Sequence, residues 1–372
     1  MSMKILLLST GGKIGGEETF TRNLAISLIA KGHIVEVAVG GFVQAKDLNS
    51  KNVSICPVDI TSRTPFGLLK AAKQLTLYVS ANGFDIVHAQ AIGPAIMGVL
   101  AKKYYACTIP WIWHNHGITD FSYKHIVSRL NTLNAIIANS DYVRESLKGH
   151  KVKAEIIKRV HNGICVENFS VSEDERLVCK KEFKKSIKAS DTDKLLIYVG
   201  RLSPEKGVEV LLKAFERLYK NMPNIQCVLV GDGIQKKNLQ MQITNYTSKQ
   251  RIHFLGFRKD IKELVAACDV LVLPSHIETF SLTTLQAFAT GTPCIASDVG
   301  GTPEQVLDKF NGLLFKDNDC DELSEKLQLL LANDDLHDYL VRNAKKLSAS
   351  YLNTDRMTRD IENIYVELIK NE

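Results

Sequence analysis

The sequence predicts an α/β protein made of two consecutive doubly wound domains, each built on a parallel sheet. The chain has 372 residues, more than one hydrophobic core usually organises, and 45% of them are hydrophobic, which is enough for two cores. Short runs of β-branched and aliphatic residues alternate with segments of helical periodicity, which is typical of repeated βα units. That alternation occurs in both halves of the chain, on either side of a polar stretch.

The strand-like runs of the first half alternate with segments such as Phe20, Leu24 and Leu28, whose spacing predicts one apolar helix face. In doubly wound sheets, ligands bind at the carboxyl ends of the strands, so the loops after these runs are the candidate sites. The runs lie at residues 4–8, 34–39, 84–89, 109–113 and 134–139.

The second half repeats this organisation, with a helix predicted from Val208, Leu211 and Phe215. A polar, turn-rich stretch at residues 178–194 leads into it, and we place the domain division after residue 167. The domains are therefore 1–167 and 168–354, and the strand-like runs of the second lie at residues 195–200, 226–231, 252–256, 269–274 and 293–298.

Composition narrows the function classes. The eight cysteines are scattered without a C-x-x-C pair, which predicts reduced, mostly buried thiols. No apolar stretch predicts a signal peptide or a membrane span, so we expect a cytoplasmic protein. Residues 1–167 hold 19 Lys and Arg against 11 Asp and Glu, a balance of +8, which suits phosphates, anionic lipid or nucleic acid as well as a solvated surface.

The first strand ends in a glycine-rich loop that includes Gly15 and Gly16, where backbone N–H groups can approach an anion. A Walker A loop requires Lys-Ser/Thr after the last glycine, but Glu17 and Glu18 follow instead. Neither this loop nor residues 231–236 fits G-x-G-x-x-G. These departures disfavour an ATPase and a dinucleotide oxidoreductase.

A second loop, GRLSPEKG, follows the strand at residues 195–200 and carries Arg201 and Lys206. Ser203 and Pro204 predict the N-cap and first residue of the helix that contains Val208. A guanidinium, an ammonium and open backbone N–H groups at one helix start suit a diphosphate, although surface charge is the simpler alternative.

The residues from Glu278 to Ser297 predict a helix that begins near Ser281 and ends by Gly291, and they supply the motif that identifies a family. GRLSPEKG followed by E-x-F-S-L-x-x-x-Q-A-x-A-x-G-T-P-x-I-A-S closely resembles the retaining GT-B glycosyltransferases of family GT4. The segments GGEET, KGHIVEV, DIVHA, HNG and FLGF extend the resemblance over nearly the whole chain. The resemblance implies the GT-B fold, two Rossmann-like domains with parallel sheets facing a central cleft, and a last helix at 355–372 that packs back on the first domain.

The resemblance also implies roles for individual residues. Arg201 and Lys206 would bind the donor diphosphate, Glu278 would contact the transferred sugar and support positive charge at its anomeric carbon, and Gln286 would meet the ribose. Gln286 departs from the family, which usually has a glutamate there, and the exchange should cost about 1 kcal/mol, or about fivefold in donor affinity. The other implied donor-binding residues are Gly15, Gly16, Gly256, Phe257, Arg258, Phe280, Ser281 and Leu282.

Two histidines follow the strand at residues 109–113. Their i,i+2 spacing predicts that His114 and His116 share a face and line a cleft, while zinc binding and simple packing remain alternatives. The resemblance implies that His116 lies beside the donor sugar and acts with Glu278, Arg201 and Lys206 in catalysis.

We therefore expect a retaining hexosyltransferase that moves a sugar from a nucleotide-diphosphate sugar, with UDP favoured, to a hydroxyl of a glycan or lipid-linked acceptor. The resemblance implies front-face transfer with no metal and no cofactor, in bacterial cell-surface polysaccharide synthesis at the inner face of the plasma membrane. The basic segments at residues 66–79 and 123–133 could touch anionic lipid, or could be ordinary amphipathic helices. A nucleotide-sugar binder of low activity, an epimerase of the same fold and, on charge alone, a nucleic-acid binder are the alternatives; we expect no nucleic-acid partner.

Overall fold

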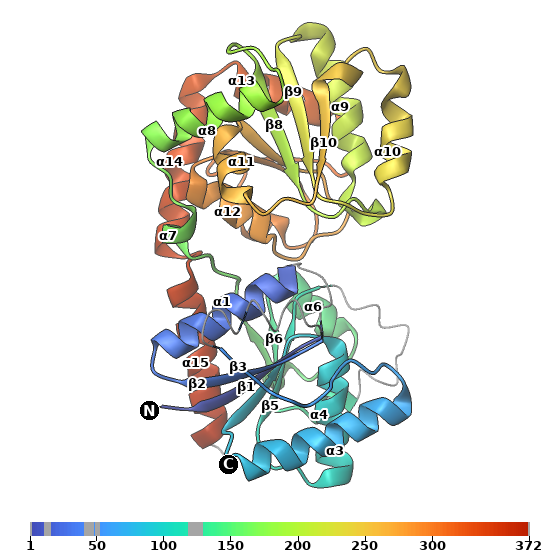
Figure 1. Cartoon of the computed structure of the whole chain (residues 1–372), viewed down its shortest axis with the longest axis vertical. Coiled ribbons are helices and arrows are strands. Elements are labelled where there is room, and N and C mark those ends of the chain that lie inside the picture. The colour runs from blue at the N-terminus through green and yellow to red at the C-terminus, as the bar shows by residue number, and fades with distance from the viewer. Residues whose placement is uncertain (1, 11–15, 41–47, 49–52, 118–128, 371–372) are drawn as a thin grey trace. The chain divides into compact units, whose positions relative to one another are not determined.

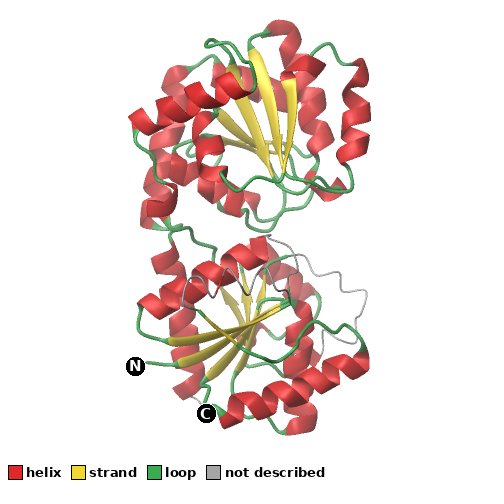
Figure 2. Ribbon diagram, in the orientation of Figure 1, coloured by secondary structure: helices red, strands yellow, loops and turns green. Residues whose placement is uncertain are grey.

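The computed structural model describes residues 2–10, 16–40, 48, 53–117 and 129–370. The chain divides into two compact units, a first unit of residues 1–162 with 354–372 and a second unit of residues 163–353 (Figure 1). Both have the layered α/β architecture that the sequence predicts, with helices on both faces of a parallel sheet (Figure 2).

The sheet of the first unit has the strand order β3-β2-β1-β4-β5-β6-β7, and all its pairs are parallel. Helices α1 and α15 cover one face and α3 and α4 the other, so the aliphatic strands are buried on both sides. The strands are β1 (Lys4–Ser9), β2 (Ile34–Val39), β3 (Ser54–Ile55), β4 (Ile86–Ala89), β5 (Trp111–Asn115), β6 (Ala135–Ala138) and β7 (Ile157–Arg159). The helices are α1 (Gly16–Ala30), α3 (Pro65–Ala81), α4 (Ile92–Tyr105), α6 (Asp141–Gly149), the short 3₁₀ turn η1 (Ala154–Ile156) and α15 (Thr354–Lys370).

The sheet of the second unit has the order β10-β9-β8-β11-β12-β13, again all parallel. Helices α9 and α13 pack on one face, and α8, α11 and α12 pack on the other. The strands are β8 (Lys194–Val199), β9 (Ile225–Val230), β10 (Ile252–Gly256), β11 (Val270–Leu273), β12 (Cys294–Ser297) and β13 (Leu313–Phe315). The α-helices are α7 (Val166–Phe169), α8 (Glu173–Ser186), α9 (Val208–Asn221), α10 (Lys236–Gln242), α11 (Ile261–Ala267), α12 (Leu282–Thr290), α13 (Cys320–Leu331) and α14 (Asp334–Ser350). The 3₁₀ turns are η2 (Pro204–Lys206), η3 (Ile243–Asn245), η4 (Lys249–Arg251) and η5 (Thr302–Glu304).

The division of the chain differs slightly from the predicted one. The chain enters the second unit before residue 167, because the Ile164 amide donates to the Leu352 carbonyl at 3.0 Å and the Ile164 side chain packs in the second unit's core. The last helix, α15, belongs to the first unit, where Ile361 and Tyr365 are buried with residues of α1.

In each sheet, the strand order reverses at one place. In the second unit the reversal falls between β8 and β11, so the loops that follow these two strands leave the same edge of the sheet in opposite directions. Such a switch point is the usual ligand position of a doubly wound sheet. These two loops carry Arg201, Lys206 and Glu278.

All eight cysteines are free thiols, as the sequence predicts, and most are buried. Among the described residues, no helix is both long and apolar enough to cross a membrane.

Candidate functional site

The loop after β8, which carries Arg201 and Lys206, leads into α9 in a different way from the sequence prediction. Ser203 does not cap α9: its hydroxyl donates to Glu205 Oε1 at 2.6 Å, and Pro204 starts the 3₁₀ turn η2. Gly207, in the left-handed region at φ 57°, then reverses the backbone, and α9 starts at Val208. The prediction failed because Gly207 separates the turn that Ser203 and Pro204 start from the helix α9, and the Ser-Pro pattern does not reveal this separation.

Lys206 and Glu278 meet at the switch point. The Lys206 ammonium donates to Glu278 Oε2 at 2.8 Å, and the two side chains are only 22% and 11% exposed. Arg201, in contrast, is 73% exposed and lies 3.9 Å from Glu205 Oε1. The structure therefore brings Lys206 and Glu278 together and leaves Arg201 largely in solvent on the same loop.

Backbone contacts fix the Glu278 loop. The Glu278 carbonyl accepts a hydrogen bond from the Gly301 amide at 3.1 Å, and its side-chain Oε1 accepts one from the Thr279 amide at 3.1 Å. Both contacts hold a carboxylate that is mostly withdrawn from water at a defined place.

The segment that follows begins α12, as the sequence predicts. Ser281 is the N-cap, with its hydroxyl accepting from the Thr284 amide at 3.3 Å, while Phe280 is buried and Leu282 partly buried in the core. Gly291 ends the helix in the left-handed conformation at φ 80°. Gln286 is half-buried, one turn beyond Leu282, so the departure from the family lies on α12 itself.

Thr283 connects the start of α12 to the end of β8, since its hydroxyl donates to the Val199 carbonyl at 3.4 Å. The N-terminus of α12 and the Arg201 loop thus share one strand end, which gives an anion both helix N–H groups and side-chain cations.

Gly256, Phe257 and Arg258 follow β10. Gly256 has φ 67°, and its carbonyl accepts from the Gly231 amide at 2.8 Å, which joins the loops after β9 and β10. Phe257 is 56% exposed, and Arg258 donates from Nε to Asp260 at 2.7 Å. The exposed Phe257 ring is available to a planar group, while the Arg258 guanidinium is already paired with Asp260.

The other predicted residues belong to the first unit. Gly15 lies outside the described residues, and Gly16 is the first residue of α1. Beside it, Glu17 accepts a hydrogen bond from Ser9 Oγ at 3.0 Å, and burial raises the pKa of Glu17 to about 7 despite that hydrogen bond. Sequence reasoning did not single out Glu17, because its burial depends on packing against the end of β1.

Three histidines of the first unit form a stack. His114 is near-parallel to both neighbours, with ring centroids 5.5 Å from His88 and 4.2 Å from His116. Phe20 packs edge-on against His114 and His116 at 4.6 and 4.4 Å. The prediction that the two histidines share a face is confirmed, but the prediction that both line a cleft is wrong for His114, which is fully buried.

Burial keeps this stack uncharged. Desolvation lowers the pKa of His88 and of His116 to about 3, and lowers that of His114 well below its ordinary value. The ends of the stack are hydrogen-bonded, His88 Nδ1 to the Tyr365 hydroxyl at 2.6 Å and His116 Nε2 to Gln90 Oε1 at 2.9 Å. His116 is therefore a fixed, neutral imidazole.

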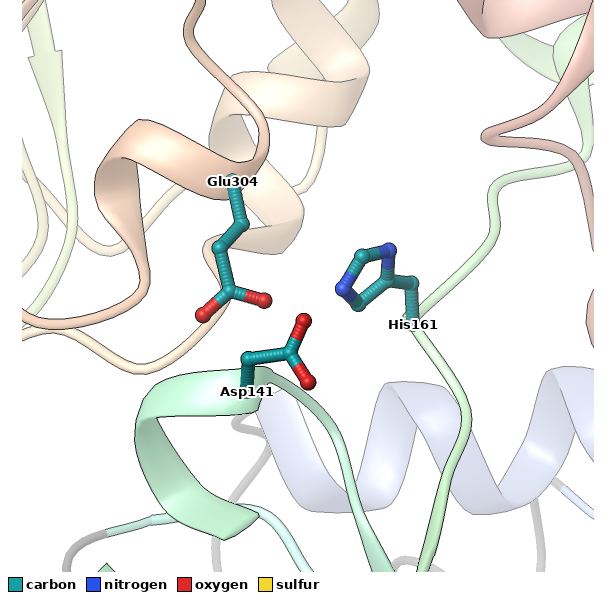
Figure 3. A group of neighbouring side chains, drawn as sticks. All are labelled: Asp141, His161 and Glu304. Atoms are coloured by element: carbon teal, nitrogen blue, oxygen red, sulfur yellow. The ribbon is translucent and has the colours of Figure 1, made fainter. Parts of the chain in front are cut away.

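Figure 3 shows Asp141 at the start of α6 and His161 after β7, both in the first unit; Glu304, which it also labels, belongs to η5 of the second unit. Arg159 contacts both first-unit residues, with Nε 3.4 Å from Asp141 Oδ1 and an N–H donated to His161 Nε2 at 2.9 Å. A guanidinium already supplies positive charge beside this pair, which disfavours a cation.

Sequence reasoning also missed His276, two residues before Glu278. Its ring nitrogens lie 2.6 Å from Asp317 and 3.0 Å from Glu209, which are far from it in sequence. The only signal in the sequence is a histidine next to the family motif, because its partners come from other elements of the fold.

Comparison with known proteins agrees with this geometry. Family models match along the chain, Glycosyltransferase Family 4 over residues 14–168 and Glycosyl transferases group 1 over residues 180–347. N-acetyl-alpha-D-glucosaminyl L-malate synthase of Bacillus anthracis is 26% identical over 96% of each chain. UDP-Gal:alpha-D-GlcNAc-diphosphoundecaprenol alpha-1,3-galactosyltransferase of Escherichia coli is 27% identical over 82% of each chain.

The solved structure of Anabaena HepE in complex with UDP and glucose has the same fold, with a TM-score of 0.85, 23% identity and coverage of 97% of this chain and 98% of HepE. That likeness confirms the predicted pair of Rossmann-like domains and the GT-B fold class. With both halves of the sequence matched by glycosyltransferase models, the chain belongs to the group 1 glycosyltransferases of the GT4 type.

Proposed function

We propose that this glycosyltransferase moves a sugar from a UDP-sugar to a hydroxyl of a glycan or lipid-linked acceptor, with retention of configuration. The observation that carries the proposal is the Lys206–Glu278 pair at the switch point of the second unit, beside the exposed Arg201. A cation for the diphosphate and a carboxylate for the sugar are held in contact there. The named donor of the Escherichia coli relative and the UDP and glucose of the HepE complex favour UDP.

In the proposed reaction the acceptor oxygen bonds to the anomeric carbon on the face from which the diphosphate oxygen leaves. The proton of the acceptor hydroxyl passes to a departing phosphate oxygen. Arg201, Lys206 and the N–H groups at the start of α12 stabilise the negative charge of the leaving diphosphate, and Glu278 supports positive charge on the sugar. His116 stays neutral and serves as a hydrogen-bonding group for the sugar, not as an acid.

We also propose that transfer needs no metal ion and no cofactor. Arg201 and Lys206 supply the positive charge that a divalent cation would supply beside a diphosphate. Aspartates at D-x-D spacing have other partners: Asp193 binds Arg251, Asp317 binds His276, and Asp319 caps α13. Activity that survives EDTA and does not rise with Mg²⁺ or Mn²⁺ supports this, while loss of activity in EDTA refutes it.

We further propose that the acceptor is presented at the cytoplasmic face of the plasma membrane, in cell-surface polysaccharide synthesis. Helix α3 buries Ala71, Leu75 and Val79 but exposes Phe66 (80%) and Leu77 (63%). Lys70 and Lys73 on the same helix are exposed too, so an apolar and cationic surface is available to anionic lipid. The segment 123–133 lies mostly outside the described residues.

Co-sedimentation with vesicles tests the membrane proposal. Anionic vesicles should retain the protein more than zwitterionic ones, and Lys70→Glu with Lys73→Glu should weaken that retention. Equal retention of the double variant and the unaltered protein contradicts lipid contact through α3.

The decisive experiment for the function offers UDP-, GDP- and ADP-sugars with glycan and lipid-linked acceptors. It measures donor binding, acceptor-dependent nucleotide release and, by NMR, the anomeric configuration of the product. Lys206→Ala should weaken UDP-sugar binding by about 10-fold or more, because it removes a charge-assisted contact worth about 1.5 to 3 kcal/mol. Lys213→Ala is the matched control, since Lys213 is an exposed lysine of α9 in the same unit.

Gln286 favours one alternative, a nucleotide-sugar binder of low activity, because the neutral amide replaces the family's usual glutamate. Binding without nucleotide release under any acceptor supports that alternative. Conversion of the donor sugar without transfer supports an epimerase, and unchanged donor affinity in Lys206→Ala refutes the diphosphate site.

A further inference from the structure

His276 lies between two carboxylates that come from different elements of the second unit. Its Nδ1 is 2.6 Å from Asp317 Oδ1, in the turn after β13, and its Nε2 is 3.0 Å from Glu209 Oε1, in the first turn of α9. A neutral imidazole has one N–H and donates to only one of these oxygens. Hydrogen bonds to both carboxylates in their ionised form therefore require the imidazolium.

The same residue joins the two loops that hold the candidate donor site. The backbone amides of His276 and Ile277 donate to the Glu205 carbonyl at 3.0 and 3.3 Å. Lys206 follows that carbonyl, and Glu278 follows those amides. The Glu209 contact adds a side-chain connection from the Glu278 loop to α9.

The charged groups around His276 favour its protonated form. Glu209 faces it from α9 and Asp317 from the turn after β13. Glu205 of η2 presents its carbonyl to this loop and uses its carboxylate on Ser203, whereas Lys206 and Glu278 are paired with each other. Partial burial lowers the pKa of His276, but the hydrogen bonds to Glu209 and Asp317 outweigh burial and raise it above its ordinary value.

We propose that the His276 imidazolium is a positioning residue that holds the Lys206 loop against the Glu278 loop, so that donor affinity falls when His276 loses its proton. The proposal rests on the proposed function of these two loops as the donor site. Deprotonation leaves one of the two carboxylates without its donor and removes the attraction between α9 and the turn after β13. Lys206 then loses the fixed distance from Glu278 that preorganises the site.

The first test needs no donor. NMR titration of the His276 imidazole should show a pKa above that of an exposed histidine, and Glu209→Gln or Asp317→Asn should lower it. Hydrogen exchange at residues 204–208 should be faster in His276→Gln than in the unaltered protein at the same pH. His337→Gln is the matched control, since His337 is a histidine of α14 beside a single carboxylate, Asp338. A pKa at or below the ordinary value, or unchanged exchange at residues 204–208, overturns the proposal.

The second test measures UDP-glucose binding by calorimetry from about pH 6 to about pH 8.5. UDP-glucose is suitable because both phosphates are esterified and lose no proton in this range. The unaltered protein should lose about fivefold in affinity across the His276 titration, as expected for about one hydrogen bond. His276→Gln should bind with the weaker affinity at every pH, and Glu209→Gln should shift the fall to lower pH.

The two hypotheses fail in different ways. The same pH dependence in His276→Gln and in the unaltered protein overturns the role of His276 while leaving the donor site intact. Equal UDP-glucose affinity in Lys206→Ala and the unaltered protein overturns the donor site, and the exchange experiment still decides whether His276 joins the loops.

Discussion

Replacing Gly207 with alanine should separate the two loops of the donor site. Gly207 has φ 57°, and a Cβ there would lie 2.0 Å from the Pro274 carbonyl oxygen and 3.2 Å from His276 Nε2. Ordinary contact begins at 3.4 Å, so the backbone of Pro274 and that of residue 207 must move apart by about 1.4 Å, the difference between these distances. Lys206 is next to Gly207 in the chain, and Glu278 follows Pro274 in the loop on the other side of the contact.

The expected cost has two parts. The left-handed conformation costs an alanine about 1 to 2 kcal/mol, and a forced backbone displacement costs about 1 to 3 kcal/mol. Gly207→Ala should therefore lower the free energy of unfolding of the second unit by about 2 to 5 kcal/mol. Gly83 isolates the first part, because its φ is 62° and a Cβ added there would meet no atom within 4 Å.

Urea unfolding measures both variants. Far-UV circular dichroism follows the whole chain, while tryptophan fluorescence follows the first unit alone, because both tryptophans, Trp111 and Trp113, are in β5. Gly83→Ala should lower the stability reported by fluorescence by about 1 to 2 kcal/mol. Gly207→Ala should leave the fluorescence transition unchanged and lower the transition of the second unit. Calorimetry with UDP-glucose should then show weakened binding in folded Gly207→Ala. If Gly207→Ala costs no more than Gly83→Ala and binds UDP-glucose normally, the close contact does not set the loop spacing.

Three further predictions concern single sites. Lys206→Met leaves the mostly buried Glu278 unpaired and should destabilise the second unit by about 2 kcal/mol, whereas Lys206→Met with Glu278→Leu should recover that loss in urea unfolding without recovering activity. His114→Phe should make the first unit less sensitive to acid. Below about pH 6.5, His114 binds a proton in the unfolded chain but not in the folded one, where it is buried, and this difference favours unfolding. The urea midpoint measured by fluorescence should therefore fall less between neutral pH and about pH 5 in the variant than in the unaltered protein. Gln286→Glu should raise UDP-sugar affinity by about fivefold if this side chain meets the ribose, and calorimetry showing no gain contradicts that contact.

The strands that the sequence predicts are runs of mostly apolar residues that are long enough to stand out from the segments around them, such as β8 and β9. The strands β3 (Ser54–Ile55), β7 (Ile157–Arg159) and β13 (Leu313–Phe315) escaped prediction. Each has too few residues to show a period, and each lies at the edge of its sheet, where one neighbouring strand is enough to define it.

In the site, contacts between residues close in sequence are predictable, and contacts between distant residues are not. Motifs local in sequence, such as the Ser281 cap and the Gly291 end of α12, are predictable because their hydrogen bonds join residues close in the chain. The Lys206–Glu278 contact joins residues 72 apart, and the resemblance to the family implied their shared function but not their ion pair. The His276 contacts depend on a third and a fourth element, α9 and the turn after β13, and no local pattern in the sequence predicts them.

The Lys206–Glu278 pair is better explained by donor binding than by stability. Withdrawing two charges from water costs about as much as their attraction returns, so such a pair contributes little net free energy to folding. The pair does provide an ammonium and a carboxylate at fixed positions at one edge of the sheet. The loops that carry them are held by Gly207, by the Glu205 carbonyl and by His276. When the Lys206 ammonium binds a diphosphate, the Glu278 carboxylate loses its partner and can face the sugar. Positive charge develops on the sugar during transfer. This pair should therefore matter for function and not for stability, and the variant with Lys206→Met and Glu278→Leu should be folded and inactive.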